Sequence, residues 1–393
     1  MNVLICTHHY PAPEALGLVP DTKVVHYFAR MLMEKGHRVQ VVHLAYHPVK
    51  EISLSSLRAV LPVYRDYDIE GVPVHLMLYQ MLTPRRFYPE GFQARLINAH
   101  LRRLKKRFVP DQVFIHFPTT FTGLTELVRG CPHVLGDFHN MDVTLLKERD
   151  KSGRVRAFIR QIPAWGYRNK NVHAYLKDVL GGSPVPVYTG IDADLLAPAA
   201  FIEEKKSRRP GRLRLLYAGQ LIPLKNVDCL IRAFSRLSFD AELTIIGDGP
   251  ERVQLEALAG NHPAITFTGW LPREQVIEKM KDADVFVMVS SPETYGMVYL
   301  EAMAQGCLAV ASRGEGFDGL IRDGENGFLC APGDEDELLL VLERIAQLSS
   351  EERSRLIDAA YALAVSMTED KTTEGFLRAN ADGVQSKEIS QRS

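Results

Sequence analysis

The sequence predicts an α/β protein built from two doubly wound domains that face a central cleft. Short apolar runs alternate with amphipathic stretches along the whole chain, a pattern typical of parallel sheets covered by helices. A charged segment near residues 203–211, ending in Pro210-Gly211, indicates a linker between two such series. The length of 393 residues also fits two domains better than one. Ligands of these sheets bind at the carboxyl ends of the strands, so we expect the functional site there.

The elements follow in order along the chain. In the first half we expect strands at Val3–Cys6, Val39–Leu44, Val72–Leu78 and Val113–Phe117, and helices at Thr22–Lys35 and Phe92–Arg107. In the second half we expect strands at Leu213–Ala218, Leu243–Ile246, Ile265–Thr268 and Val285–Val289, and helices at Val227–Leu237, Glu251–Ala259 and Glu274–Lys281. The predicted domains are therefore 1–205 and 206–375, and a polar tail, 376–393, either crosses back or is disordered.

Composition narrows the class of protein. With 46% hydrophobic residues, 24% charged residues and a net charge of −1, the chain is typical of a soluble globular protein and not of a general nucleic-acid binder. The five cysteines are scattered and odd in number, which indicates a reduced protein without a disulfide framework. The apolar run at the N-terminus is too short for the hydrophobic region of a signal sequence, and no apolar run approaches the length of a membrane span. We therefore expect a cytoplasmic location.

Residues 290–306 carry the main functional prediction. Pro292 and Gly296 keep the first part of this segment in a loop after a strand, and a helix is expected from Met297. The start of that helix, Gly296–Val298, offers unpaired N–H groups and the positive end of the helix dipole, which suit a diphosphate. Glu301, one turn inside, suits the diol of a ribose, and Glu293 suits another part of the same ligand. By spacing alone, two such glutamates are usually solvated surface charges.

The wider context resembles a known family. The segment from Glu293 to Glu301, followed by Ala302-Met303-Ala304-Gln305-Gly306, strongly resembles the E-x7-E signature of glycosyltransferase family 4 and related retaining enzymes of the GT-B fold. Further motifs in the family's order are Tyr188–Asp192, Tyr217–Val227, Ile245–Pro250, Phe267–Pro272 and Asp323–Phe328. The resemblance covers nearly all of 185–345 and is thinner before it, and it implies a GT-B fold of two Rossmann-like domains.

The resemblance also implies roles for single residues. Lys225 stands where the family binds the diphosphate, and the turn with Trp270 and Leu271 is similar to the one that holds the nucleobase. Gly296, Met297, Val298 and Glu301 complete the implied donor site, with Gly17 as the glycine of the loop that approaches the phosphates. His139 is similar to the histidine that faces the transferred sugar, so Glu293, His139 and Lys225 are the implied catalytic residues. Gln220 stands where the family usually has Arg, and it carries no charge.

The implied function is retaining transfer of a hexose from a UDP- or GDP-sugar to a glycan or lipid-linked saccharide, as in bacterial polysaccharide biosynthesis. No metal or cofactor is implied, because the three D-x-D matches in the chain lie beside ordinary helices and strands. Two alternatives stay open: a non-catalytic nucleotide-sugar-binding subunit, and a nucleotide-sugar 2-epimerase of the same fold.

A basic amphipathic pattern predicts one further partner. Six cations fall on the expected helix 92–107 beside apolar residues: Arg95, Arg102, Arg103, Lys105, Lys106 and Arg107. A second basic stretch follows with Arg154, Arg156, Arg160, Arg168 and Lys170. Such helices can lie on anionic membranes, although a solvated face over the core is as good an interpretation. We therefore expect peripheral contact with the inner face of the membrane as one possible location.

Overall fold

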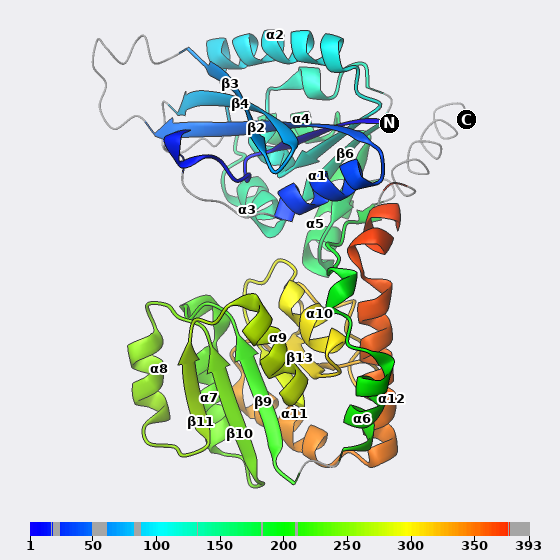
Figure 1. Ribbon diagram of the computed structural model, residues 1–393. Coiled ribbons are helices and arrows are strands. Elements are labelled where there is room, and N and C mark those ends of the chain that lie inside the picture. The colour runs from blue at the N-terminus through cyan, green and yellow to red at the C-terminus, as the bar shows by residue number, and fades with distance from the viewer. Residues whose placement is uncertain are drawn as a thin grey trace. The chain divides into compact units, whose positions relative to one another are not determined.

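The computed structural model describes residues 1–16, 18, 24–48, 61–81, 88–131, 133–181, 184–208, 211–375 and 377. The chain forms two compact units, each with its own sheet (Figure 1). Unit 1 comprises Met1–Arg168, Val172–Thr189 and Thr373–Ser393, and unit 2 comprises Asn169–Asn171 and Gly190–Thr372. The chain therefore leaves unit 1 before residue 190 and re-enters it at Thr373.

The boundary differs from the one expected at 205/206. The segment taken as a linker is largely a helix of unit 2, α6 (Ala199–Ser207). Its charged sequence is misleading because Lys205 is buried, and the Lys205 ammonium donates to the carbonyls of Met280 at 3.0 Å and Gln305 at 2.7 Å. A buried ammonium is tolerated where such acceptors meet it, and those acceptors are far away in sequence.

In unit 1 the described residues form an eight-stranded sheet in the order β3-β4-β2-β1-β5-β6-β7-β8. Its strands are β1 (Asn2–Thr7), β2 (Arg38–Pro48), β3 (Val63–Ile69), β4 (Val72–Met81), β5 (Gln112–His116), β6 (His133–Phe138), β7 (Ala164–Tyr167) and β8 (Val185–Pro186). The pairings are parallel except that β3 runs antiparallel to β4. Strand order reverses direction between β1 and β5, which is where doubly wound sheets place a ligand site.

Alternation along the strands divides the core of unit 1 between two faces. Leu4 and Cys6 of β1 pack in one buried cluster, and Val3 and Ile5 pack in another. The helices of the unit are α1 (Val24–Glu34), α2 (Gly91–Phe108), α3 (Asn140–Glu148), α4 (Arg154–Ile159) and α5 (Lys170–Leu180). Helix α1 covers the second cluster, while α2 to α5 contribute side chains to the first.

Unit 2 contains a parallel six-stranded sheet in the order β11-β10-β9-β12-β13-β14, counted over the described residues. Its strands are β9 (Leu213–Ala218), β10 (Ala241–Ile246), β11 (Ile265–Gly269), β12 (Val285–Met288), β13 (Leu308–Ser312) and β14 (Phe328–Cys330). Besides α6, its helices are α7 (Val227–Ser235), α8 (Arg252–Ala259), α9 (Arg273–Asp282), α10 (Met297–Ala304), α11 (Glu335–Ala346) and α12 (Ser350–Ser366). The expected strands and helices of both halves are confirmed to within a few residues.

The chain winds from β9 outward to β11 and then returns to place β12 on the other side of β9. The switch point of this sheet therefore lies between β9 and β12, and their carboxyl ends lead into the loops that hold Lys225 and Glu293. Among the described residues, no helix is both long enough and apolar enough to cross a membrane.

Candidate functional site

The loop and helix after β12 form the centre of the site in unit 2. Helix α10 begins at Met297, and Gly296 before it has a φ of 84°, a left-handed conformation that favours glycine. A Cβ at Gly296 would also lie 2.5 Å from the ring of Tyr299. Gly296 has no side chain to cap the helix, so the first N–H groups of α10 are available to an acceptor. This is the geometry that binds a phosphate at a helix start.

Lys225 and Glu293 meet in this loop. The Lys225 Nζ lies 2.6 Å from Glu293 Oε2, and the two side chains are 21% and 13% exposed. Glu293 Oε2 also accepts from Ser290 Oγ at 3.0 Å, and Oε1 accepts from the N–H of Thr294 at 3.1 Å. The structure therefore joins two residues that the sequence could only place in separate motifs.

Glu315, which the sequence did not predict as a site residue, accepts hydrogen bonds from the loop that carries Glu293. Its Oε2 accepts from the N–H of Glu293 at 2.8 Å, and its Oε1 accepts from Ser291 Oγ at 2.8 Å. The N–H of Gly316 in turn donates to the carbonyl of Glu293 at 2.9 Å, and a Cβ at Gly316 would lie 2.6 Å from the backbone of Tyr295. Sequence reasoning missed Glu315 because nothing in a lone surface-like glutamate predicts a contact 22 residues away.

The turn that carries Lys225 is fixed to the same loop through the backbone. Asn226 has a left-handed φ of 49°, and its Nδ2 donates to the carbonyl of Val289 at 2.7 Å. The N–H of Ser291 donates to the carbonyl of Leu224 at 2.8 Å. These bonds set the position of the Lys225 ammonium without using the ammonium itself.

The glycine turn near Gln220 is a packing feature. A Cβ at Gly247 would lie 1.8 Å from the carbonyl oxygen of Gly219, and one at Gly249 would lie 2.4 Å from that of Leu221. The backbone carbonyl of Gln220 accepts from Tyr217 Oη at 2.8 Å. The Gln220 side chain is exposed, and its amide makes no hydrogen bond to any residue in the described ranges.

Glu301 is paired with an arginine that the sequence analysis missed. Both hydrogen bonds go to Glu301 Oε1, from Arg273 Nη2 at 2.5 Å and Nε at 3.0 Å, and the Glu301 side chain is 13% exposed. Glu301 Oε2 has no hydrogen-bond partner within the described part of unit 2. Arg273 is the first residue of α9, where a cation opposes the helix dipole, and that conflict was the available signal.

Trp270 lies in the turn between β11 and α9, three residues before Arg273. Its side chain is 72% exposed, which is unusual for the largest apolar residue, and Leu271 beside it is half-buried. Exposed aromatic surface of this kind is suited to a flat ligand group.

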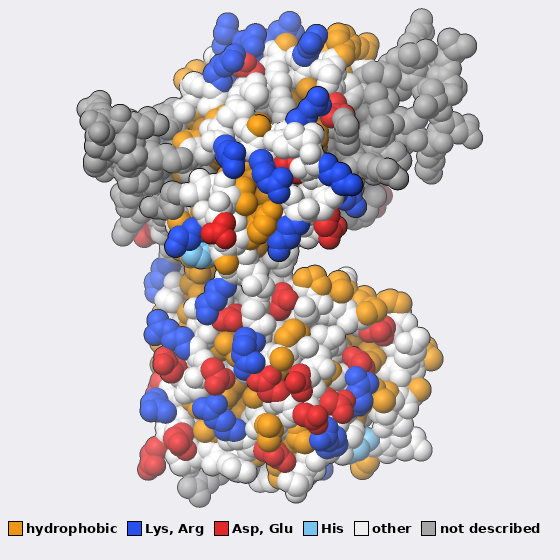
Figure 2. All heavy atoms as spheres, turned by 180° about the vertical axis from the view of Figure 1, so that it is seen from behind, with side chains coloured by type: hydrophobic (Ala, Val, Ile, Leu, Met, Phe, Trp, Pro, Cys, Tyr) orange, Lys and Arg blue, Asp and Glu red, His pale blue; other side chains and the backbone are white. Residues whose placement is uncertain are grey.

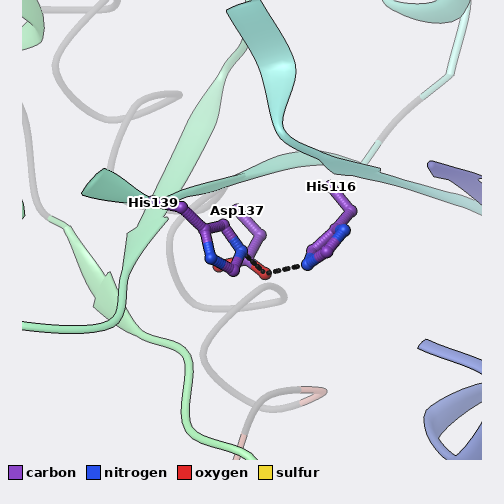
Figure 3. A group of neighbouring side chains, drawn as sticks. All are labelled: His116, Asp137 and His139. Carbon is purple, nitrogen blue, oxygen red and sulfur yellow. Dashed lines mark hydrogen bonds and ion pairs between the residues drawn. The ribbon is translucent and has the colours of Figure 1, made fainter. Parts of the chain in front are cut away.

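The histidine expected in unit 1 lies in a buried cluster of charged and ring side chains (Figure 3). His139 Nε2 is 3.1 Å from Asp137 Oδ2, and His116 Nε2 is 3.7 Å from the same oxygen. His116 is the last residue of β5, Asp137 lies near the end of β6, and His139 directly follows β6. The cluster therefore lies at the carboxyl ends of strands near the switch point. Gly17, the other expected residue of unit 1, lies outside the described residues.

Arg168 sets the charge of this cluster. Its Nη2 lies 2.7 Å from Asp137 Oδ2, and its Nε donates to His139 Nε2 at 3.1 Å. Burial alone raises the pKa of the Asp137 carboxyl, but Arg168 and His139 outweigh it and hold that pKa well below its usual range. Burial and the Arg168 charge lower the pKa of His139, and burial lowers that of His116 well below its ordinary value. At neutral pH both imidazoles are therefore uncharged beside an ionised Asp137.

The spacing of the cluster alone would admit a metal ion, since the ligand-capable atoms of His116, Asp137 and His139 lie within 4.8 Å of one another. The Arg168 guanidinium, a permanent cation, already donates to two of these atoms. A divalent cation would have to displace that charge or lie against it, so the cluster does not fit a metal.

Comparisons with known proteins give matches over part of the chain. Residues 199–363 match a family described as glycosyl transferases group 1. The sulfoquinovosyl transferase SQD2 of Arabidopsis thaliana is 32% identical over 163 residues, which are 40% of this chain and 32% of that protein. The lipopolysaccharide core biosynthesis glycosyltransferase LpsE of Rhizobium meliloti is 34% identical over 164 residues, which are 41% of this chain and 47% of that protein. The chain thus matches less than half the length of these curated relatives.

The solved structures show the fold. The HepE protein of Anabaena, solved in complex with UDP, superposes with a TM-score of 0.68 at 15% identity. The match covers 97% of this chain and 100% of the HepE chain. The expected GT-B fold, with its two Rossmann-like units, is confirmed.

Proposed function

We propose that the protein transfers a hexose from a nucleotide-diphosphate sugar to a saccharide acceptor, because its residues 199–363 match the family described as glycosyl transferases group 1. The observation that carries this proposal is the Lys225–Glu293 pair, 2.6 Å apart, beside the uncapped start of α10. This loop and helix start would supply a cation and unpaired N–H groups, the donors that a diphosphate leaving group needs. The curated relatives are named for transfer of sugars, and one solved neighbour holds UDP, which supports UDP as the first nucleotide to test.

In the proposed mechanism the diphosphate lies against the N–H groups of Met297 and Val298. The Lys225 ammonium moves from sharing Glu293 to sharing the phosphate oxygens, and it stabilises the charge that develops as the sugar–phosphate bond breaks. Glu293 then faces the anomeric carbon as a carboxylate, where it supports oxocarbenium character. The departing phosphate oxygen accepts the proton of the acceptor hydroxyl, so the new bond forms on the face that the leaving group vacates.

Other residues of the donor site hold the nucleoside in this proposal. Glu301 Oε2 accepts from a ribose hydroxyl while Arg273 fixes Oε1, and the exposed face of Trp270 lies against the base. His139 of unit 1 hydrogen-bonds the transferred sugar. No residue of this scheme needs a divalent cation, so excess chelator should leave turnover unchanged.

The test is a thermal-shift screen with UDP, GDP and their sugars, followed by assay of the stabilising donor with candidate acceptors. Stabilisation by a nucleotide sugar together with transfer at retained anomeric configuration supports the proposal. A donor converted without an acceptor would identify a 2-epimerase. Binding without any turnover would favour a non-catalytic subunit, the reading to which the uncharged Gln220 points.

We further propose that α2 brings unit 1 to an anionic membrane surface carrying a lipid-linked acceptor. Figure 2 shows Lys and Arg side chains gathered along the edge that α2 forms. Arg95, Arg103, Lys106 and Arg107 are exposed there, with Phe92 58% exposed at the start of the helix. Lys105 is different, because its Nζ donates to the carbonyls of Glu126 and Arg129 at 2.7 and 2.6 Å.

The second basic stretch does not form a matching face. Arg156 donates to the carbonyl of Leu146 at 2.8 Å, Lys170 pairs with Asp318 at 2.7 Å, and Arg168 is buried. Flotation with anionic vesicles at low salt tests the α2 proposal. Reversal of Arg103, Lys106 and Arg107 to glutamate should abolish flotation, and a wild-type protein that stays unbound would contradict it.

A further inference from the structure

Arg168 is a buried cation whose three guanidinium nitrogens all have partners within unit 1. It is 7% exposed, although its place in a basic stretch suggested a solvated side chain. Nη2 and Nε donate to Asp137 Oδ2 at 2.7 and 3.2 Å, Nε also donates to His139 Nε2 at 3.1 Å, and Nη1 donates to Thr189 Oγ1 at 2.7 Å. A guanidinium neither accepts a hydrogen bond nor loses its proton in a protein. The positive charge at this point is therefore permanent.

The arrangement around His139 fixes the ring as well as the backbone. The Asp142 Oδ2 accepts from the His139 N–H at 2.8 Å, and Phe117 stacks on the imidazole with ring centroids 4.0 Å apart. Figure 3 shows a ring nitrogen of His139 directed at Asp137. The His139 side chain also accepts from the backbone N–H of Asp142 in the capping box at the start of α3. The ring is thus held in one orientation by groups of unit 1.

Asp137 would act very differently without Arg168. A buried carboxylate 3.1 Å from an imidazole favours the protonated ring, because the resulting ion pair satisfies both groups. Arg168 supplies that positive charge first, so a second charge on His139 would lie against a cation 3.1 Å away. The other charged or titratable groups that face His139 are His116 at the end of β5, His9 in the loop after β1, and Asp142 on α3.

We propose that Arg168 is a positioning residue that neutralises Asp137 and thereby keeps His139 an uncharged hydrogen-bonding group for the transferred sugar. This inference rests on the proposed function for its purpose, and on the geometry for its electrostatics. The reacting sugar gains positive charge in the transition state, so an imidazolium beside it would oppose the reaction. A neutral imidazole can still orient a hydroxyl and carries no such repulsion. The buried charge of Arg168 therefore serves the proposed reaction as well as the packing of unit 1.

The test follows the titration of His139 by NMR of the protein with 13C-labelled histidine, with the His139 resonance identified by its loss in His139→Gln. In the wild type the midpoint of this resonance should lie below the ordinary histidine value of about 6.5, because burial and the Arg168 charge lower the pKa of His139. In Arg168→Gln the midpoint should move up from its wild-type position. The double variant Asp137→Asn with Arg168→Gln removes both charges, and its midpoint should again lie below the ordinary value.

Arg156→Gln is the matched control, because Arg156 lies 3.5 Å from the fully buried Asp150 in the same unit. It should leave the His139 titration unchanged. Arg168→Lys gives an independent reading if Arg168→Gln does not fold, because it keeps the charge and should keep His139 neutral. An unchanged midpoint in Arg168→Gln, or a titration near neutral pH in either Arg168→Lys or the double variant, would overturn the proposal.

Activity supplies the second readout. Arg168→Gln should lose kcat below about pH 7 and regain part of it at pH 8, with little change in donor KM, which a merely structural role would not produce. A shifted NMR midpoint with a flat pH profile would leave the electrostatic role of Arg168 intact and contradict the role of His139 in transfer.

Discussion

Replacement of Glu301 by Ala tests the donor site with a magnitude that the geometry supplies. Arg273 already occupies Glu301 Oε1 with two hydrogen bonds, so the ribose depends mainly on Oε2. Loss of one charge-assisted hydrogen bond costs about 1.5–3 kcal/mol, which lowers UDP affinity roughly 10- to 150-fold. The fold should tolerate the change, because Arg273 is 49% exposed and an ion pair with such a partner contributes only about 0–1 kcal/mol.

Isothermal titration calorimetry with UDP measures this effect, with thermal unfolding as the check on folding. Glu335→Ala is the matched control, since Glu335 pairs with Arg232 at 2.6 Å at the start of α11, away from α10. The control should lose a similar small stability and bind UDP as the wild type does. Equal UDP affinity in Glu301→Ala and wild type would refute the assignment of Glu301 to the ribose.

Three further changes test separate parts of the structure. Glu293→Gln should lower kcat by about 100-fold or more while UDP affinity changes less than about threefold, because the carboxylate acts on the sugar. Steady-state kinetics and calorimetry measure the two quantities, and equal losses of turnover and UDP binding would contradict the role of Glu293 at the sugar. Gly247→Ala should destabilise unit 2 by about 3 kcal/mol or more, because its Cβ would lie 1.8 Å from the Gly219 carbonyl at a φ of 136°. The control Gly260→Ala, at a φ of 56° with nothing within 4 Å, should cost only about 1–2 kcal/mol, so similar melting curves for the two variants would argue against close packing at Gly247. Burial raises the pKa of Asp142 to about 7, although hydrogen bonds from Thr119 and His139 oppose the rise. A raised acid pKa contributes stability at low pH that is lost as pH rises from about 4 to 7, so the destabilisation by Asp142→Asn in thermal unfolding should be larger at pH 5 than at pH 8, and equal destabilisation at the two pH values would show that Asp142 is ionised at both.

The fold and the main motif of the proposed donor site could be predicted from the sequence, but the residues that pair with that motif could not. Local periodicity decides where β9, β12 and α10 lie, because each is a short run whose pattern is complete in itself. Gly296 and Glu301 could be named in advance because they belong to one contiguous motif. Glu315 and Arg273 could not, since each meets the motif from 22 or 28 residues away and looks like an ordinary surface charge.

Buried charge accounts for the misinterpreted segments. Lys205 made α6 look like a linker, and Arg168 made the segment after β7 look like part of an exposed basic face. In both cases the charge is satisfied by groups distant in sequence, which hydrophobic periodicity does not register. A cation at an unfavourable position, such as Arg273 at a helix start, is the kind of local conflict that marks a long-range partner.

The most direct measurement is a crystal structure of the protein with UDP. We expect the diphosphate within hydrogen-bond distance of the N–H groups of Met297 and Val298, the Lys225 ammonium on the phosphate oxygens, and a ribose hydroxyl on Glu301 Oε2. UDP bound elsewhere on unit 2, or bound with its diphosphate away from the start of α10, would contradict the proposed donor site.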